Sequence, residues 1–333
     1  MWNLVNSGKV YFVLLIPVMC IFSAAVLTGY QYLVSQIPVV RENDIPLYRY
    51  RPFSENNNLA KLDEESNLSL TYDLPVLDGA TALFPLYASF AQAVYSMSEY
   101  KETKDLVLNS RTNGAYENLL QGQADIIFCA QPSQEQMELF LEEGKTLKMT
   151  AIGREALVFF VNIRNPVNSL TTENIRGVYS GKIKNWLDLH GQNQIIRVFQ
   201  RPPNSGSQTI LEKIMDGVPI APPRRENVMA DMGGIINQVA VYRNFSNAIG
   251  YSFLYFSAEM VINDQIKLLS IDGVYPSRET IQDNSYPFTN NFYAIYTESN
   301  TQNRNIELFI SWILSRQGQE LIQKTGYAPI NRY

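Results

Sequence analysis

Three short segments of the sequence combine glycine, small residues and hydroxyl side chains just before a predicted helix. They are residues 77–83 (LDGATAL), 110–115 (SRTNGA) and 201–208 (RPPNSGSQ). The beginning of a helix leaves backbone N–H groups unpaired and carries a partial positive charge, so it favours an anion. Glycine lets the backbone approach a ligand closely, and hydroxyl groups add hydrogen-bond donors. The pattern indicates a site for a small anion.

Arg201 adds a full positive charge to the third segment. Its planar guanidinium can pair with two oxygens of a tetrahedral oxyanion. Each feature alone also has an ordinary structural explanation. Ser205 and Gln208 have the spacing of a capping box, Asn113 is a candidate N-cap, and an arginine is usually a solvated surface cation. Three such segments together with an arginine make an anion site a stronger candidate than any one of them does, and the ordinary explanations stay open at this point.

The composition excludes several classes of site. The 333 residues carry a net charge of −5, which argues against the generally basic surface of a nucleic-acid-binding protein. The sequence contains one histidine, His190, and two cysteines, Cys20 and Cys129. A clustered Cys/His metal site cannot be built from this set, and we expect neither a metal nor a cofactor.

An enzymatic function would need more than the hydroxyl groups of Ser205 or Ser207. A serine nucleophile requires a positioned base, and His190 lies in a predicted surface turn (LDLHG). Phosphoryl transfer with Mg²⁺ would need clustered carboxylates, and only Asp78 adjoins a glycine-containing turn. A serine-dependent or phosphoryl-transfer enzyme is a remote alternative, and we expect a binding protein that is not an enzyme.

The N-terminal segment contains an uncharged stretch over residues 10–34. A helix of roughly 25 residues spans the hydrocarbon core of a membrane with some tilt. Lys9 precedes this stretch and favours an extracytoplasmic location for the rest of the chain. Residues 1–34 are therefore predicted to be a single anchor in the plasma membrane. The alternative is a signal peptide cleaved near Ser23-Ala24-Ala25, which would make the protein secreted or periplasmic.

Residues 35–70 have no sustained periodicity and contain prolines, an asparagine run at 56–58 and an acidic run at 63–65. We predict that they form an extracytoplasmic tether. From residue 72 onward, short apolar strands alternate with helical patterns, which is typical of α/β architecture with open sheets. The predicted strands are residues 124–129, 156–162, 195–199 and 292–296, and the predicted helices are residues 83–96, 134–143, 208–215 and 305–315.

The chain from Asp73 to the C-terminus resembles the substrate-binding proteins of ABC-type phosphate importers. The combination of motifs and their order along about 260 residues carry the resemblance, because no single motif is specific. The matching stretches are Gly79-Ala80-Thr81, Gly153 through Val161-Asn162, residues 179–186 (YSGKIKNW), Arg201 with Ser205-Gly206-Ser207, residues 248–251 (AIGY) and residues 286–289 (YPFT).

The resemblance implies a type-2 periplasmic-binding fold with two α/β lobes joined by two crossovers. Lobe 1 would comprise residues 71–152 plus 287–333, and lobe 2 would comprise residues 153–286. The ligand, expected to be inorganic phosphate or a similar tetrahedral oxyanion, would bind between the lobes and pass to the permease and ATPase subunits of an ABC transporter. An anchored oxyanion sensor or surface scaffold with the same fold is the alternative.

The resemblance also implies the ligand-binding residues. The family's motifs match this sequence at Thr81, at the Ala82 amide, at Thr112 or Asn113, and at Arg201, Ser205, Gly206 and Ser207.

Two positions depart from the family's pattern. Family members have an aspartate that accepts the proton of phosphate, where this chain has Ala130 or Gln131, and the aspartate that usually partners the arginine is replaced by Pro203. We hypothesise that Glu155 takes over as the proton acceptor. The alternative is that Arg154 and Glu155 form a structural pair at the first crossover.

Overall fold

The computed structural model describes residues 46–102, 106–230, 232–240 and 246–331, together with positions 19, 23 and 26. The predicted anchor, residues 1–34, lies outside the described residues apart from those three positions. Within the described part of the chain, none of the helices combines the length and the apolar character that crossing a bilayer requires. Residues 1–39 and 40–333 form separate units.

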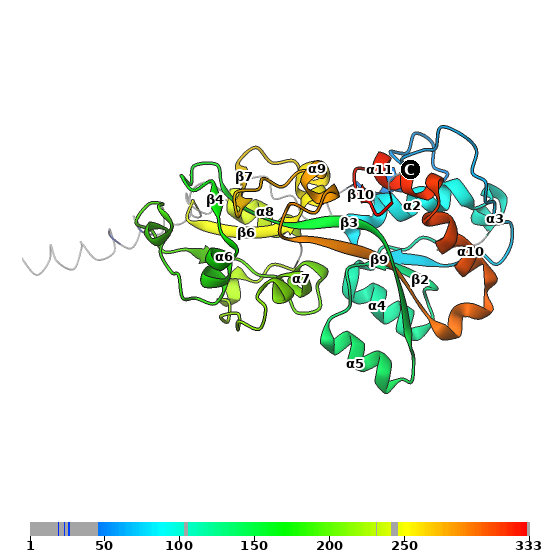
Figure 1. The fold of residues 1–333 in the computed structure, drawn as a ribbon, viewed down its shortest axis with the longest axis horizontal. Coiled ribbons are helices and arrows are strands. Elements are labelled where there is room, and N and C mark those ends of the chain that lie inside the picture. The colour runs from blue at the N-terminus through cyan, green and yellow to red at the C-terminus, as the bar shows by residue number, and fades with distance from the viewer. Residues whose placement is uncertain are drawn as a thin grey trace, which may run out of the picture. The chain divides into compact units, whose positions relative to one another are not determined.

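Helices and strands alternate along the second unit (Figure 1). The helices are α2 (Phe84–Val94), α3 (Met97–Glu102), α4 (Arg111–Gln121), α5 (Gln134–Glu142), α6 (Thr172–Tyr179), α7 (Gly206–Ile214), α8 (Met232–Ala240), α9 (Arg278–Gln282), α10 (Arg304–Ile313) and α11 (Arg316–Thr325). The strands are β1 (Leu77–Gly79), β2 (Ile126–Cys129), β3 (Leu147–Asn162), β4 (Ser169–Leu170), β5 (Arg197–Val198), β6 (Ala248–Phe253), β7 (Ile266–Leu268), β8 (Ser270–Ile271), β9 (Thr289–Thr297) and β10 (Ala328–Pro329).

The main sheet of the described residues is open and mixed. Its strands follow the order β1-β2-β9-β3-β6-β5, and β7 and β10 also pair with β3. The pairs β1–β2 and β5–β6 are parallel, whereas β2–β9, β3–β9 and β3–β6 are antiparallel. A second, two-stranded sheet joins β4 to β8. This arrangement confirms the predicted α/β class with open sheets.

The long strand β3 connects the two halves of the main sheet. Its first part, residues 147–156, pairs with β9, and residues 157–161 pair with β6 (Figure 1). Residues 155–162 are all buried, as expected for an apolar run that is covered on both faces. The neighbouring return segment is tied to β3 by the Leu157 N–H, which donates to the Phe288 carbonyl over 3.1 Å.

Buried apolar side chains form separate clusters on the two sides of this junction. One cluster joins β1, β2 and β9 to α2, α4, α10 and α11, and in it Phe90 packs edge-on against Trp312 at a centroid distance of 6.1 Å. Another joins β3 and β6 to α6 and α7, where Phe159 contacts Tyr179 in the same geometry at 5.7 Å. A third, smaller cluster packs α8 against β6 and includes Ile235. Each set of helices therefore covers its own part of the sheet.

The described part of the predicted tether, residues 46–70, packs onto the first cluster instead of forming a free linker. Leu59 and Leu70 are buried, and the Ala60 N–H donates to Ser89 Oγ over 3.1 Å. Asp63 pairs with Lys324 of α11 at 2.6 Å. The apolar residues of this stretch are isolated and follow neither a helical nor a strand period, so the sequence pattern did not reveal their burial.

Two smaller predictions concern the histidine and a cysteine. His190 is exposed at φ 60°, at the end of a 3₁₀ turn over Trp186–Leu189, which confirms the predicted surface turn. Cys129 is a free thiol buried at the end of β2, and its burial raises its pKa well above the ordinary range. The thiol therefore serves as a small core side chain.

Candidate functional site

A cavity of about 260 Å³ collects residues from all three glycine-containing segments. It lies where α2, α4 and α7 begin. Its lining residues are Ala80, Thr81, Ser110, Arg111, Thr112, Asn113, Gly114, Arg201, Pro202, Pro203, Ser205, Gly206, Ser207, Ala230, Met232 and Phe253. Seven of the nine predicted site residues are thus brought together, namely Thr81, Thr112, Asn113, Arg201, Ser205, Gly206 and Ser207.

The first turn follows β1. Ala80 is extended, Thr81 opens a 3₁₀ turn, and α2 continues from Phe84 with Pro85 in its first turn, where a missing N–H costs nothing. Thr81 is buried, and its Oγ1 donates to Asn109 Oδ1 over 3.2 Å. The hydroxyl group is thereby held at the cavity wall.

The second turn is held against the first by Asp78. This carboxylate is fully buried, and its Oδ1 accepts from the Ser110 N–H over 2.8 Å. Its Oδ2 accepts from Asn118 Nδ2, also over 2.8 Å. The helix begins at Arg111, earlier than its sequence pattern suggested, so Thr112 and Asn113 lie in the first turn of α4.

The third turn leads into α7, which begins at Gly206 after the N-cap residue Ser205. The capping-box explanation of this segment is wrong, because the Ser205 side chain accepts no bond from the helix. Gln208 Oε1 instead accepts from the Arg201 N–H over 3.2 Å and from Tyr251 Oη over 2.5 Å. Gln208 therefore supports the backbone of Arg201.

The N-cap residues of α4 and α7 differ from those of α5, α6 and α9, although Ser315 of α11 also forms no side-chain cap. Ser133, Thr171 and Ser277 form complete capping boxes at α5, α6 and α9. In contrast, neither the Ser110 nor the Ser205 side chain accepts a bond from a backbone N–H of its own helix, and Ser110 Oγ accepts instead from Asn118 Nδ2 over 2.9 Å. Among the described residues, the solvent-shielded Ser205 Oγ also has no hydrogen-bond partner. Backbone N–H groups and a hydroxyl are consequently available to an anion.

The charged side chains among the described residues that line the cavity are Arg111 and Arg201. Arg201 is only 9% exposed, and Arg111 contributes a second guanidinium from the start of α4. Arg111 has φ 63°, a left-handed conformation that is uncommon outside glycine and is often found at functional sites. None of the described lining residues is an aspartate or glutamate. The electrostatic character of the cavity favours a negatively charged ligand.

The beginnings of α4 and α7 approach each other closely. A Cβ atom added to Gly206 would lie 3.0 Å from Thr112 Oγ1. Nearby, Ser133 Oγ donates to Asn204 Oδ1 over 2.7 Å, and Asn204 Nδ2 donates to Glu135 Oε2 over 2.8 Å. A side chain at 206 would therefore press on Thr112, which would have to shift by a few tenths of an ångström.

The two remaining predicted residues, Ala82 and Glu155, line an adjacent cavity of about 20 Å³ that shares Thr112 and Gly206 with the larger one. The two Glu155 oxygens accept from the Ala156 and Tyr255 N–H groups over 2.8 and 3.2 Å. Burial raises the pKa of Glu155 to about 7, although these backbone donors oppose the rise. This position does not support the hypothesis that Glu155 accepts a ligand proton.

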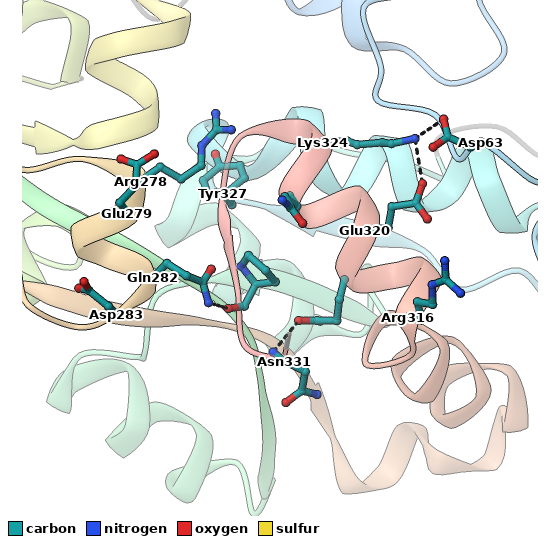
Figure 2. Close-up of a pocket in the computed structure, with 13 residues that line it drawn as sticks. Asp63, Arg278, Glu279, Gln282, Asp283, Arg316, Glu320, Lys324, Tyr327 and Asn331 are labelled. Atoms are coloured by element: carbon teal, nitrogen blue, oxygen red, sulfur yellow. Dashed lines mark hydrogen bonds and ion pairs between the residues drawn. The ribbon is translucent and has the colours of Figure 1, made fainter. Parts of the chain in front are cut away.

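A larger cavity has a different character (Figure 2). It measures about 750 Å³ and lies between α9, α11 and the C-terminal segment. Its lining mixes acids and bases, and Lys324 already pairs with Asp63 at 2.6 Å and with Glu320 at 2.8 Å. It contains none of the predicted site residues.

Sequence reasoning did not select several residues that shape the anion cavity. Arg111 and Ser110 stand in the second segment, and the position of Arg111 next to Thr112 could have identified it as a second cation. Asp78 was considered only as a metal ligand, whereas it holds two turns together. Met232 and Phe253 reach the cavity only through tertiary packing. Among the described residues, no cluster of His, Cys, Asp or Glu could hold a metal ion.

Comparisons with known proteins show the family to which the chain belongs. Residues 73–317 match the model of a PBP superfamily domain. The phosphate-binding protein PstS of Bacillus subtilis is 25% identical over 283 residues, which cover 83% of this chain and 85% of PstS. PstS of Borreliella burgdorferi is 26% identical over 57% of this chain and 68% of its own length.

Solved structures show the same fold. An ABC-type phosphate transport receptor from Vibrio cholerae has a TM-score of 0.58 and 21% identity, covering 78% of this chain and 99% of the receptor. The predicted resemblance to substrate-binding proteins of phosphate importers is thus confirmed, and the mixed α/β architecture is of the type-2 periplasmic-binding kind. The chain belongs to the PBP superfamily.

Proposed function

We propose that this protein captures inorganic phosphate in the cavity at the beginnings of α2, α4 and α7 and delivers it to the permease and ATPase subunits of an ABC transporter. The observation that carries the proposal is the convergence of three helix beginnings and two guanidinium groups on one cavity. Backbone amides, hydroxyls and guanidinium forks together suit the oxygens of a tetrahedral oxyanion. The names of the PstS relatives support phosphate as the ligand.

The proposed binding site lies between two lobes, residues 71–152 plus 287–333 and residues 153–286. The division is supported by the two larger core clusters and by β3, which changes sheet partner after residue 156. Two strands that pass side by side between lobes permit a hinge motion. Phosphate would be enclosed when Thr81 and Thr112 of lobe 1 approach Arg201 and Gly206 of lobe 2.

The proposed protein binds its ligand without transforming it. His190 is exposed in a turn over Trp186–Leu189 and does not line the cavity, so Ser205 and Ser207 have no imidazole base there. We further propose that residues 10–34 anchor the protein in the plasma membrane with the binding domain outside the cytoplasm. The uncharged character of that stretch supports the anchor.

Titration calorimetry of the purified full-length chain with phosphate tests the proposal. Arg201→Ala should weaken binding at least tenfold, because it removes a charge-assisted pair worth about 1.5–3 kcal/mol. Arg201→Lys should recover only part of the affinity, since an ammonium lacks the planar fork. Arg316→Ala, in the other cavity, is the matched control and should bind as the unaltered protein does. A loss below twofold in Arg201→Ala would place the arginine outside the binding site.

A further inference from the structure

The segment that precedes the matched domain is attached to proposed lobe 1. Residues 46–70 lie before the PBP superfamily domain, which begins at residue 73. The Phe53 N–H donates to Gln92 Oε1 of α2 over 3.2 Å, and Asn57 Nδ2 donates to the same oxygen over 2.6 Å. The Phe53 ring also packs on Tyr100 of α3 at a centroid distance of 5.0 Å. We therefore expect this part of the segment to move with the helices of lobe 1.

The beginning of the same segment also reaches proposed lobe 2. Leu47 opens a 3₁₀ turn over Leu47–Tyr50, and its partly buried side chain packs against two apolar clusters. One is the cluster of β1, β2 and β9 in lobe 1, and the other is the cluster of α8 and β6 in lobe 2. Met260, which ends a short π-helical turn of lobe 2 over Phe256–Met260, packs against the same two clusters. Both side chains therefore lie at the junction of the lobes.

Tyr50, at the other end of the turn, agrees with this placement. Its ring packs against the lobe 1 cluster. Burial raises the pKa of Tyr50, the Arg49 guanidinium opposes the rise, and the Glu259 carboxylate of lobe 2 adds to it. Because such an influence weakens with distance, Tyr50 lies near the Phe256–Met260 turn.

The described conformation is one in which the two lobes touch. Near the strand pair β3–β9, Tyr255 of lobe 2 packs against Tyr327 of lobe 1 at a centroid distance of 4.4 Å. Beside the anion cavity, Ser133 Oγ of lobe 1 donates to Asn204 Oδ1 of lobe 2 over 2.7 Å. The contacts of Leu47 and Tyr50 therefore belong to a conformation in which the lobes meet across the cavity.

We propose that residues 47–50 form a strap that bridges the two lobes and stabilises the conformation in which they touch across the anion cavity. The inference rests on the proposed function, because it concerns the motion that would enclose phosphate. A contact made in only one of two conformations favours that conformation. A change in the angle between the lobes moves the Phe256–Met260 turn relative to α2, and Leu47 then cannot keep both of its apolar contacts. The strap thus favours closure before any ligand binds.

The distance between the lobes can be measured directly by pulsed electron paramagnetic resonance on the full-length chain. Leu139→Cys in α5 and Leu187→Cys in the turn Trp186–Leu189 place one spin label on each lobe, because both leucines are exposed. Cys20→Ser removes one native thiol, and Cys129 is buried. The measurement needs no phosphate, so it tests the strap separately from ligand binding.

In the ligand-free protein, Leu47→Ala should shift the distribution of interlobe distances towards longer values. Leu62→Ala is the matched control, because Leu62 belongs to the same segment and, among the described residues, packs against the lobe 1 cluster alone. Its distribution should equal that of the otherwise unaltered protein. Equal distributions in the two variants, or shorter distances in Leu47→Ala, would overturn the inference. Should circular dichroism show that Leu47→Ala is unfolded, Leu47→Val is compared in the same way.

Titration calorimetry with phosphate gives a second test. Leu47→Ala should weaken binding about threefold, because the apparent affinity falls with the population of the binding-competent conformation. Leu62→Ala should bind as the unaltered protein does, and equal affinities in the two variants would contradict the inference. Failure of phosphate to bind any of these proteins would instead refute the proposed function, while the distances in the ligand-free protein would still decide on the strap.

Discussion

At the scale of single residues, Asp78 shows how a buried charge can shape a binding site without touching the ligand. Its two oxygens accept from the Gly79 and Ser110 N–H groups and from Asn118 Nδ2, so that it joins the end of β1 to the start of α4. Buried carboxylates persist only where hydrogen bonds compensate for lost hydration. Asp78 therefore helps to fix the position of the second turn, together with the bond from Thr81 Oγ1 to Asn109 Oδ1.

Asp78→Asn should lower both the free energy of unfolding and the affinity for phosphate. The new Nδ2 group would face Asn118 Nδ2, and two donors facing each other cost about 1–3 kcal/mol. The double variant Asp78→Asn with Asn118→Asp reverses the direction of this bond and should recover most of the loss. Urea denaturation and calorimetry of the four proteins form a double-mutant cycle. Additive losses in this cycle would show that the two side chains are not coupled.

The burial of Glu155 predicts that the free energy of unfolding depends on pH. Burial raises its pKa from 4.5 to about 7, so the folded state keeps a proton that the unfolded chain releases at lower pH. The free energy of unfolding should therefore fall as pH rises from about 4.5 to about 7, by about 3 kcal/mol in total. Glu155→Gln should remove this slope. Denaturant unfolding across that pH range measures both proteins, and identical slopes would show that Glu155 titrates normally.

At the scale of elements, the beginnings of helices differ in how they are capped. Those of α5, α6 and α9 are closed by their own side chains, whereas those of α4 and α7 face the cavity without such caps, and α11 also begins without one. A missing cap costs about 1 kcal/mol. At α4 and α7, we interpret this cost as the consequence of keeping N–H groups available to a ligand. Hydrogen bonds from these groups to a bound ligand would stabilise the bound state.

Asn204 links the turn before α7 to the beginning of α5, through Ser133 and Glu135. It has φ 63°, so removing its side chain has two separable effects. Asn204→Gly loses the two hydrogen bonds and should weaken phosphate binding severalfold. Asn204→Ala loses the same bonds and adds left-handed strain of about 1 kcal/mol, which should weaken binding further. Calorimetry of both variants checks the order, and equal affinities for all three proteins would exclude a role for this link.

At the scale of the whole molecule, the two strands that pass between the proposed lobes set the possible motion. β3 changes partner from β9 to β6 within one continuous strand, and the Leu157 N–H ties it to the Phe288 carbonyl at 3.1 Å. A hinge at a pair of adjacent strands allows bending while it restricts sliding. Ligand binding should then change the angle between lobes without changing their cores.

Small-angle X-ray scattering should therefore show a smaller radius of gyration when phosphate is added to the full-length chain. The change should be absent in Arg201→Ala at the same phosphate concentration, because closure requires differential binding to the closed state. Circular dichroism should remain constant, since the secondary structure is retained. A radius that does not respond to saturating phosphate would contradict closure.

The sequence by itself determined the local features of this protein. Apolar runs and helical periods placed the cores of α2, α5, α7, α10 and of β2, β3 and β9, because burial on one or both faces leaves a pattern in the residues themselves. The glycine-containing turns and Arg201 indicated an anion site because their chemistry is local. The packing of residues 46–70 escaped notice, since isolated apolar side chains have no period.

Only the tertiary structure decided which local features act together. Gln208 leaves the expected capping box and supports Arg201, while Asp78 holds Ser110 across a sequence separation of 32 residues. The tertiary structure also brings Arg111 and Phe253 to the anion cavity and places Glu155 in the adjacent, smaller cavity. Such outcomes depend on long-range packing, in which several possible partners compete for each polar group. The spacing of residues in the sequence does not indicate which partner forms the hydrogen bond.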